Sequence, residues 1–308
     1  MSGITLLMLA LSSTASAAAY DQFPMDTGNL WIFDTPTGHR AVVVEDTTEI
    51  SAGEWASDTA GLLDASVTVY DSETSDEVTV DSSGSEALFD FGAEDGDSWD
   101  VSLSDCDNYT VTASIDADSS ASTPAGDFDN IHTFELEHAP LGTACDDAPM
   151  QRIEFAEGTG PVRFVDASGQ QGTLLYAEVA GDVAAASLYD TQVTGDLSVT
   201  LVVNASEADS GALTAVVLLK NLGSEDLDIA LPQGTRFYVD TFEWLTGQPA
   251  GTSGSEGGAQ TTLSLAPGAV QTYAAEIDLG DASGSLTLQA TLNTDSVDAA
   301  SPSVTIER

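Results

Sequence analysis

The chain has 308 residues, of which 51 are acidic and 6 are basic, and its formal net charge is −45. This balance excludes nucleic acid and anionic lipid as partners, because both require clustered cations. A hydrophobic content of 42% excludes wholesale disorder, since such a chain can bury a core. The acidic residues are spread along the whole chain, which indicates adaptation to saline surroundings; a calcium-binding surface is the alternative.

Residues 1–19 predict a secretory signal peptide. An uncharged apolar run from Ile4 to Leu11 precedes Ala15-Ser16-Ala17, which fits the small-x-small rule for cleavage. The run is too short to cross a bilayer, which takes about 20 residues. No lysine or arginine precedes it, and a frayed apolar N-terminus is the alternative. We therefore expect a secreted protein, extracellular or periplasmic, without a membrane span.

Residues 20–180 predict a β-rich domain, because their apolar side chains alternate with period two. Thr59–Leu63 is the one place where the pattern favours a short helical turn. The predicted strands are Ser66–Tyr70, Glu77–Asp81, Trp99–Leu103, Tyr109–Ile115, His132–Glu137, Arg152–Phe155, Val162–Asp166 and Thr173–Val179.

A softer segment, 181–195, is expected to link this region to a second domain, 196–308. Seven or eight strands with short turns favour a β-sandwich there. A Gly/Ser-rich segment, Gly247–Gln260, predicts an exposed loop inside it. The predicted strands are Leu197–Asn204, Ala212–Lys220, Leu227–Leu231, Arg236–Trp244, Thr261–Leu265, Val270–Ile277, Leu286–Leu292 and Val304–Glu307.

Cys106 and Cys145 are the only cysteines. In an exported chain two cysteines most often form one disulfide, which here would close a loop of about 40 residues. A reactive thiol is the alternative, but neither cysteine has a cation nearby in the sequence to lower its pKa.

The sequence contains no recognisable catalytic motif. A serine or cysteine hydrolase needs a nucleophile, a base and an orienting group, and the chain has no G-x-S-x-G elbow and only three histidines, at 39, 132 and 138. His132 and His138 lie on one face of a predicted strand but lack a third zinc ligand. Glycoside hydrolysis needs a pair of carboxylates, and any two acids could approach each other in the fold, but no motif selects a pair. We therefore expect a protein that is not an enzyme.

Calcium is the one cofactor left open by the sequence. Asp95, Asp97 and Asp100 could supply oxygen ligands, and the loop Asp116–Asp129 is similarly acidic. Their spacing is not that of an EF-hand loop, and chance clusters are expected among 51 acids. The expectation is therefore no metal and no other cofactor, with calcium as the alternative.

The densest aromatic group lies next to the Gly/Ser-rich segment, where an exposed aromatic would mark a partner surface. Alternation places Phe242 and Trp244 on one face of their strand and Phe237 on the other. The candidate partner-binding residues are Phe242, Trp244, Gly247, Gly251 and Gly254.

Three phrases in the second strand set resemble the BsuPI-type intracellular proteinase inhibitor family. They are Lys220–Asp226, which ends a strand with an Asn-x-Gly turn, Pro232–Val239, a Gly-containing turn before an aromatic strand, and Leu263–Gly268, a Pro-Gly bend. The resemblance covers about 197–308 and implies an immunoglobulin-like sandwich with inhibitor-like binding. The family's tryptophan-rich segment is shortened here to Phe242-Glu243-Trp244. Residues 20–180 resemble a β-rich domain of bacterial exported proteins, in Phe23–Trp31, Leu88–Gly92 and Gly158–Arg163.

Together these features predict an all-β chain of two β domains, the second an immunoglobulin-like sandwich. The expected function is a secreted, acidic binding protein whose partner is a protein, with a protease as the first candidate. A cell-surface or extracellular structural module without inhibitory activity is the alternative.

Overall fold

The computed structural model describes residues 19–52, 54–61, 67–72, 76–79, 87–102, 107–115, 119–140, 150–232, 234–243, 249–254, 257–258, 261–280, 282–294 and 300–308. Within these ranges the chain is all-β apart from two short helices, α1 (Ala19–Gln22) and the 3-10 helix η1 (Ala205–Ser210). The predicted all-β class is therefore confirmed. No helix among the described residues has the length and apolar character that crossing a membrane requires.

Thirteen strands before residue 187 form one antiparallel sheet, in the order β6-β5-β4-β3-β2-β1-β14-β13-β12-β11-β8-β7, with β15 paired to β14. Two further strands, β9 (Ser120–Thr123) and β10 (Gly126–Asp129), pair as a separate hairpin. The strands of the large sheet are β1 (Leu30–Thr35), β2 (Gly38–Ser51), β3 (Glu54–Ala60), β4 (Val67–Ser72), β5 (Glu77–Thr79), β6 (Ala87–Asp90), β7 (Ser98–Ser102), β8 (Asp107–Ile115), β11 (His132–Pro140), β12 (Met150–Ala156), β13 (Gly160–Asp166), β14 (Gln171–Val179) and β15 (Asp182–Ala186).

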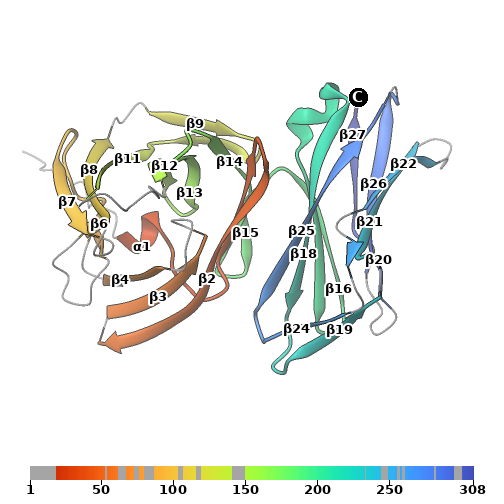
Figure 1. Ribbon diagram of the computed structural model, residues 1–308, viewed down its shortest axis with the longest axis horizontal. Coiled ribbons are helices and arrows are strands. Elements are labelled where there is room, and N and C mark those ends of the chain that lie inside the picture. The colour runs from red at the N-terminus through yellow and green to blue at the C-terminus, as the bar shows by residue number, and fades with distance from the viewer. Residues whose placement is uncertain are drawn as a thin grey trace, which may run out of the picture.

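This sheet curls around an aromatic core, with α1 inside the curve (Figure 1). The Trp99 indole N–H on β7 donates to the Ala87 carbonyl on β6, so the two ends of the sheet meet (2.7 Å). Phe155 lies at the centre of the core, with ring centroids 5.4 Å from Phe23 and 5.0 Å from Phe89. Strong curvature follows because only one face of most strands is apolar, and that face must be covered by the sheet itself.

The turn between β12 and β13 shows why a glycine is required at one corner of this core. Gly160 has φ +90, and a Cβ there would lie 2.9 Å from the Trp31 indole. The Trp31 indole N–H donates to the carbonyl of Thr159 in the same turn (2.5 Å). The buried indole therefore has its hydrogen-bond partner only because the backbone of this turn approaches it closely.

Strands after residue 187 form two four-stranded sheets, β16-β17-β18-β25 and β22-β21-β26-β27, and two short pairs, β19-β24 and β20-β23. The two larger sheets enclose a second apolar core that includes Val199, Val217, Phe237 and Leu288. The strands are β16 (Leu188–Thr194), β17 (Leu197–Val203), β18 (Ala212–Asn221), β19 (Leu227–Leu231), β20 (Gly234–Thr235), β21 (Phe237–Glu243), β22 (Pro249–Gly254), β23 (Gly257–Gly258), β24 (Thr261–Leu265), β25 (Val270–Asp278), β26 (Ser285–Leu292) and β27 (Ser303–Glu307).

The outer face of the sheet β16-β17-β18-β25 packs against β1 and β14 of the large sheet, which joins the two strand sets. All seven residues of β17 are buried, because alternate side chains point into the second core and into this joint. The joint has an apolar cluster of its own, made of Leu30, Ile32, Leu175, Tyr176, Val202, Val216 and Leu218.

Polar contacts border the apolar joint. Lys220 forms an ion pair with Glu178, which also accepts from the Tyr176 hydroxyl (3.2 Å). Burial and the Glu178 carboxylate raise the pKa of Tyr176, so its hydroxyl stays a donor. On another side, His39 Nε2 lies 3.3 Å from the Thr272 hydroxyl. The only lysine in the chain thus lies between the two strand sets.

The strands predicted for both regions are confirmed within one to three residues at their ends. Three expectations differ from the structure. Thr59 and Ala60 belong to β3 and not to a helical turn, since their alternating side chains face the core and solvent in turn. The expected linker 181–195 contains β15 and β16, which are separated by Ser187 alone. The expected loop Gly247–Gln260 contains β22 and β23, because its backbone pairs with β21 and β20. In the first region the sequence patterns also missed β1, β2, most of β3, β6, β9 and β10.

Candidate functional site

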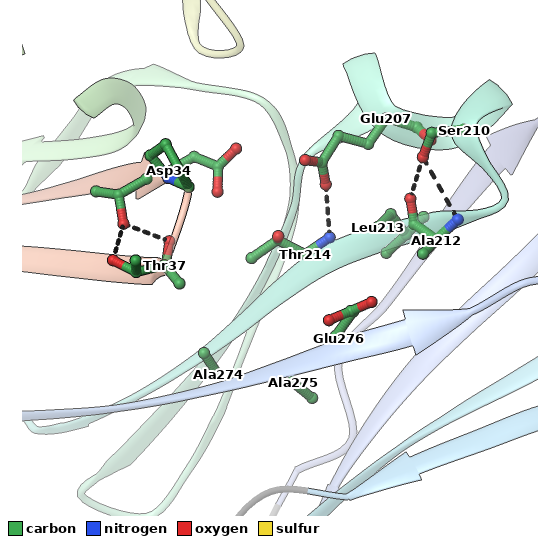
Figure 2. A pocket seen from close by; sticks show the side chains of 13 residues that line it. Asp34, Thr37, Glu207, Ser210, Ala212, Leu213, Thr214, Ala274, Ala275 and Glu276 are labelled. Carbon is green, nitrogen blue, oxygen red and sulfur yellow. Dashed lines mark hydrogen bonds between the residues drawn. The ribbon is translucent and has the colours of Figure 1, made fainter. Parts of the chain in front are cut away.

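A cleft among the described residues lies where the β1–β2 turn faces η1, β18 and β25 (Figure 2). Its volume is about 510 Å³, and its lining includes Asp34, Glu207 and Glu276. None of the described residues that line it is a lysine, arginine or histidine. A cleft of this composition disfavours anionic ligands, because nothing in it would neutralise their charge.

Each of the two carboxylates nearest the joint has a hydrogen bond that serves the fold. Asp34 Oδ2 accepts from Asn204 Nδ2 across the joint (2.8 Å), and Glu207 Oε2 accepts from the backbone N–H of Thr214 (2.7 Å). Asn204 is also the N-cap of η1, where its Oδ1 accepts from the N–H of Ser206. Burial, and then the Glu207 charge, raise the pKa of Asp34. Two of the carboxylates in this cleft therefore have structural roles, and the cleft forms a polar border of the joint.

Three of the five nominated contact residues, Phe242, Gly251 and Gly254, lie on β21 and β22, at one side of the sheet β22-β21-β26-β27. Phe242 is half-buried on β21, and Gly251 and Gly254 pair with Thr241 and Tyr238. Trp244 and Gly247 lie outside the described residues. Tyr238, which is not among the nominated residues, is 36% exposed and lies on the same face of β21 as Phe242. The structure thus places a paired edge strand where a loop was expected, next to the predicted strand that carries the exposed Tyr238.

The two histidines considered as zinc ligands lie on β11, where His132 pairs with Phe155 and Ile115, and His138 with Tyr109. His132 packs edge-on against Phe91 (5.6 Å between centroids), and burial lowers its pKa. In the described part of the chain, no group of three histidine, cysteine or acidic side chains is placed to hold a metal ion.

The acids considered as calcium ligands have roles in local structure. Asp97 Oδ2 accepts from the N–H of Glu94 in the turn before β7 (3.0 Å). Asp100 Oδ1 accepts from the Thr110 hydroxyl on the neighbouring strand (2.8 Å). Part of the second acidic loop, residues 116–118, lies outside the described residues, as do Cys106 and Cys145. The calcium alternative and the disulfide stay predictions.

A buried carboxylate of the large sheet lacks, within the described ranges of the chain, the cationic partners that buried charges usually have. Asp71 on β4 is 7% exposed, and its Oδ1 has no hydrogen-bond partner among the described residues. Burial, with a smaller contribution from Asp26, raises its pKa to about 6. Because this pKa lies above the unfolded value of 3.8, the folded state loses stability as pH rises from about 4 to about 6, and the full cost persists above that.

We expect the substitution Asp71→Asn to raise the free energy of unfolding at pH 7 by about 1–2 kcal/mol, because it removes the buried charge and keeps the shape. Below about pH 4 the gain should vanish, since the wild-type carboxyl is protonated there in both states. Urea titrations from pH 4 to pH 7 measure the difference. Asp129→Asn, at an exposed position on β10, is the matched control. A gain for Asp71→Asn that does not change with pH would contradict the assignment.

Comparison with known proteins does not assign the chain to a family. No family model matches it, and no curated protein matches it.

Proposed function

We propose that the chain is a secreted, non-catalytic binding protein that recognises a protein partner, with a protease as the first candidate. In this proposal it has two β domains, 20–180 and 196–308, and the second is an immunoglobulin-like sandwich. The two facing sheets around one core after residue 187 support that layout.

The observation that carries the proposal is the edge strand β22. Within the described residues its backbone pairs only with β21, and β25, at the edge of the facing sheet, lies near it. In this proposal an extended segment of the partner pairs with the second side of β22. Its sequence, Pro249–Gly254, carries no charge in a chain of net charge −45. Strand addition at such an edge supplies main-chain hydrogen bonds, and the neighbouring Tyr238 supplies an aromatic contact. An ordered edge strand presents a more rigid surface than a Gly/Ser loop would.

A panel of extracellular and subtilisin-like proteases, titrated with the protein, tests this function. Loss of protease activity at a 1:1 ratio is the expected result for at least one member. Tyr238→Ala should then weaken inhibition about ten-fold or more, because exposed aromatic anchors dominate such contacts. Thr305→Ala, exposed on β27 of the same sheet, should leave it unchanged. A panel without any inhibition would sink the inhibitor proposal and favour the structural alternative.

A structural module of the cell surface is the second candidate, and the joint favours it. The apolar cluster of the joint and the Lys220–Glu178 pair hold the two strand sets side by side along the long axis (Figure 1). A fixed joint of this kind suits a module that spans a distance or bears load. The same panel separates the two functions.

The use of the cations supports the proposal of a saline habitat. Arg40, Arg152, Arg163, Lys220 and Arg308, five of the six basic residues, each contact an internal carbonyl or carboxylate. Few cations are therefore left to offset the exposed carboxylates, and added salt must screen them. The free energy of unfolding should rise between about 0.1 M and 2 M NaCl. A value that stays constant or falls over this range would contradict the proposal.

A further inference from the structure

Exposed apolar side chains of the described chain concentrate on one segment. Seven large apolar residues are 36% or more exposed, and four of them lie between residues 183 and 193. We call these four side chains the apolar edge: Val183 on β15, and Leu188, Tyr189 and Val193 on β16. Tyr189 and Val193 lie on one face of β16 and Leu188 on the other, so exposed apolar groups flank this strand on both faces.

Strand β16 is also the edge strand of its sheet, with β27 of the facing sheet nearby. All seven of its residues pair with β17 on one side, and within the described residues no strand pairs with it on the other. An exposed, apolar edge strand is a template for pairing with another chain. Natural proteins usually block such an edge with charges or proline, and β16 contains neither lysine nor proline.

The low charge of β16 allows a second copy of this acidic chain to approach it. Asp190 is the only charged residue of β16. Its Oδ2 accepts from the backbone N–H of Ser303 (2.8 Å) and from Gln192 Nε2 (3.3 Å), so its carboxylate is already engaged. In a chain of net charge −45, this strip is where two copies can approach without setting free carboxylates against each other.

We propose that β16 pairs antiparallel with β16 of a second copy, around a two-fold axis through Thr191. Antiparallel pairing with this centre sets residue 189 opposite 193, and 190 opposite 192, and it uses all seven residues of the strand. Tyr189 then lies opposite Val193 of the second copy, an aromatic–β-branched pair. Asp190 lies opposite the Gln192 amide of the second copy.

Pairing around an axis through Asp190 is less favourable than pairing around the axis through Thr191. Centring the axis on Asp190 would set the two Asp190 residues directly opposite each other, which is unfavourable for like charges. The Tyr189 ring is also held in position, because it packs edge-on against Tyr176 (6.0 Å between centroids). The strand is therefore more self-complementary with the axis through Thr191 than with the axis through Asp190, and such self-complementarity favours a second copy over an unrelated extended peptide.

Sedimentation velocity of the full chain in about 2 M NaCl, up to about 100 µM, tests the proposal; salt is needed to screen the repulsion between copies. A concentration-dependent dimer is the expected result. Val193→Glu should raise its dissociation constant by at least about ten-fold, because a charge on an edge strand blocks pairing. Leu222→Glu, at an equally exposed apolar residue outside the apolar edge, is the matched control and should leave the dimer intact.

A cross-link tests the register independently. Opposite residues in an antiparallel pair have Cα atoms about 4.5–5.5 Å apart, within the range that a disulfide spans. Thr191→Cys should therefore give a reducible covalent dimer, and Leu222→Cys should not. A monomer at every concentration, a dimer that Val193→Glu leaves unchanged, or a dimer that Thr191→Cys does not cross-link would each overturn the proposal. The inhibition assay is independent of this outcome, because it concerns β22.

Discussion

The substitution Glu154→Gln is expected to lower the free energy of unfolding by about 2–3 kcal/mol. Glu154 on β12 is 2% exposed and contacts two arginines. Its Oε2 accepts from Arg163 Nε (2.7 Å) and lies 2.6 Å from Nη2, and its Oε1 lies 2.7 Å from Arg152 Nη2. Glutamine keeps the shape but turns an amide N–H₂ towards cationic donors.

The size of the expected loss in unfolding free energy depends on how exposed the two arginines are to water. Removing one member of a fully buried ion pair costs about 3–5 kcal/mol, because the other charge is left uncompensated. Here the side chains of Arg163 and Arg152 are 26% and 41% exposed, so solvent recovers part of that cost. One buried carboxylate thus forms ion pairs with two of the six basic residues in the chain.

Urea denaturation of Glu154→Gln, Arg163→Gln and the double variant measures this coupling. The double variant should lose less than the sum of the single losses, since the second change removes the charge that the first one left unpaired. Glu137→Gln, at an exposed position on β11, is the control and should stay within about 0.5 kcal/mol of wild type. Strictly additive losses would show that Glu154 and Arg163 do not act together.

The substitution Gly172→Ala is expected to cost about 3 kcal/mol, as an overpacked core position does. Gly172 on β14 lies directly opposite Phe164 on β13. A Cβ at residue 172 would lie 2.3 Å from two carbons of the Phe164 ring. The backbone there does not have a positive φ, so alanine meets no conformational penalty, and the clash with the ring is the whole effect.

The ring cannot move aside easily, because it is held on two further sides. Phe33 packs edge-on against it with centroids 5.0 Å apart, and the Arg40 guanidinium lies 4.9 Å from its centroid. Phe164→Leu in the Gly172→Ala background should therefore recover part of the loss, since a smaller side chain leaves room for the new methyl group.

Thermal and urea denaturation in high salt compare these variants. Gln171→Ala, at the exposed neighbouring residue on β14, is the control and should be near neutral. A Gly172→Ala variant as stable as wild type, or a double variant no better than the sum of its singles, would refute the proposed ring-on-glycine contact.

The candidate surfaces show how far pattern alone reaches. Alternation correctly placed β21 and its aromatics, but Gly and Ser at 251–258 have no apolar signal, so β22 and β23 were expected as loop. Likewise Leu188-Tyr189-Asp190-Thr191 alternates only weakly, and β16 was expected as linker. Strands β22 and β16 form because their backbones pair with strongly patterned neighbours, β21 and β17 respectively. Such pairing depends on contacts between segments and leaves little trace in the segment itself.

The period-two alternation determined the all-β class and most strand positions, because one face of nearly every strand must leave water. The composition determined the scarcity of cations. Only the tertiary structure decided which strands are buried on both faces, that Glu154 lies between two arginines, and that a ring covers Gly172. It also decided that Asp34 meets Asn204 across the joint, 170 residues apart in the chain. Contacts of this kind depend on how two curved sheets dock, and local periodicity is the same whichever sheet edge or face a strand finally meets.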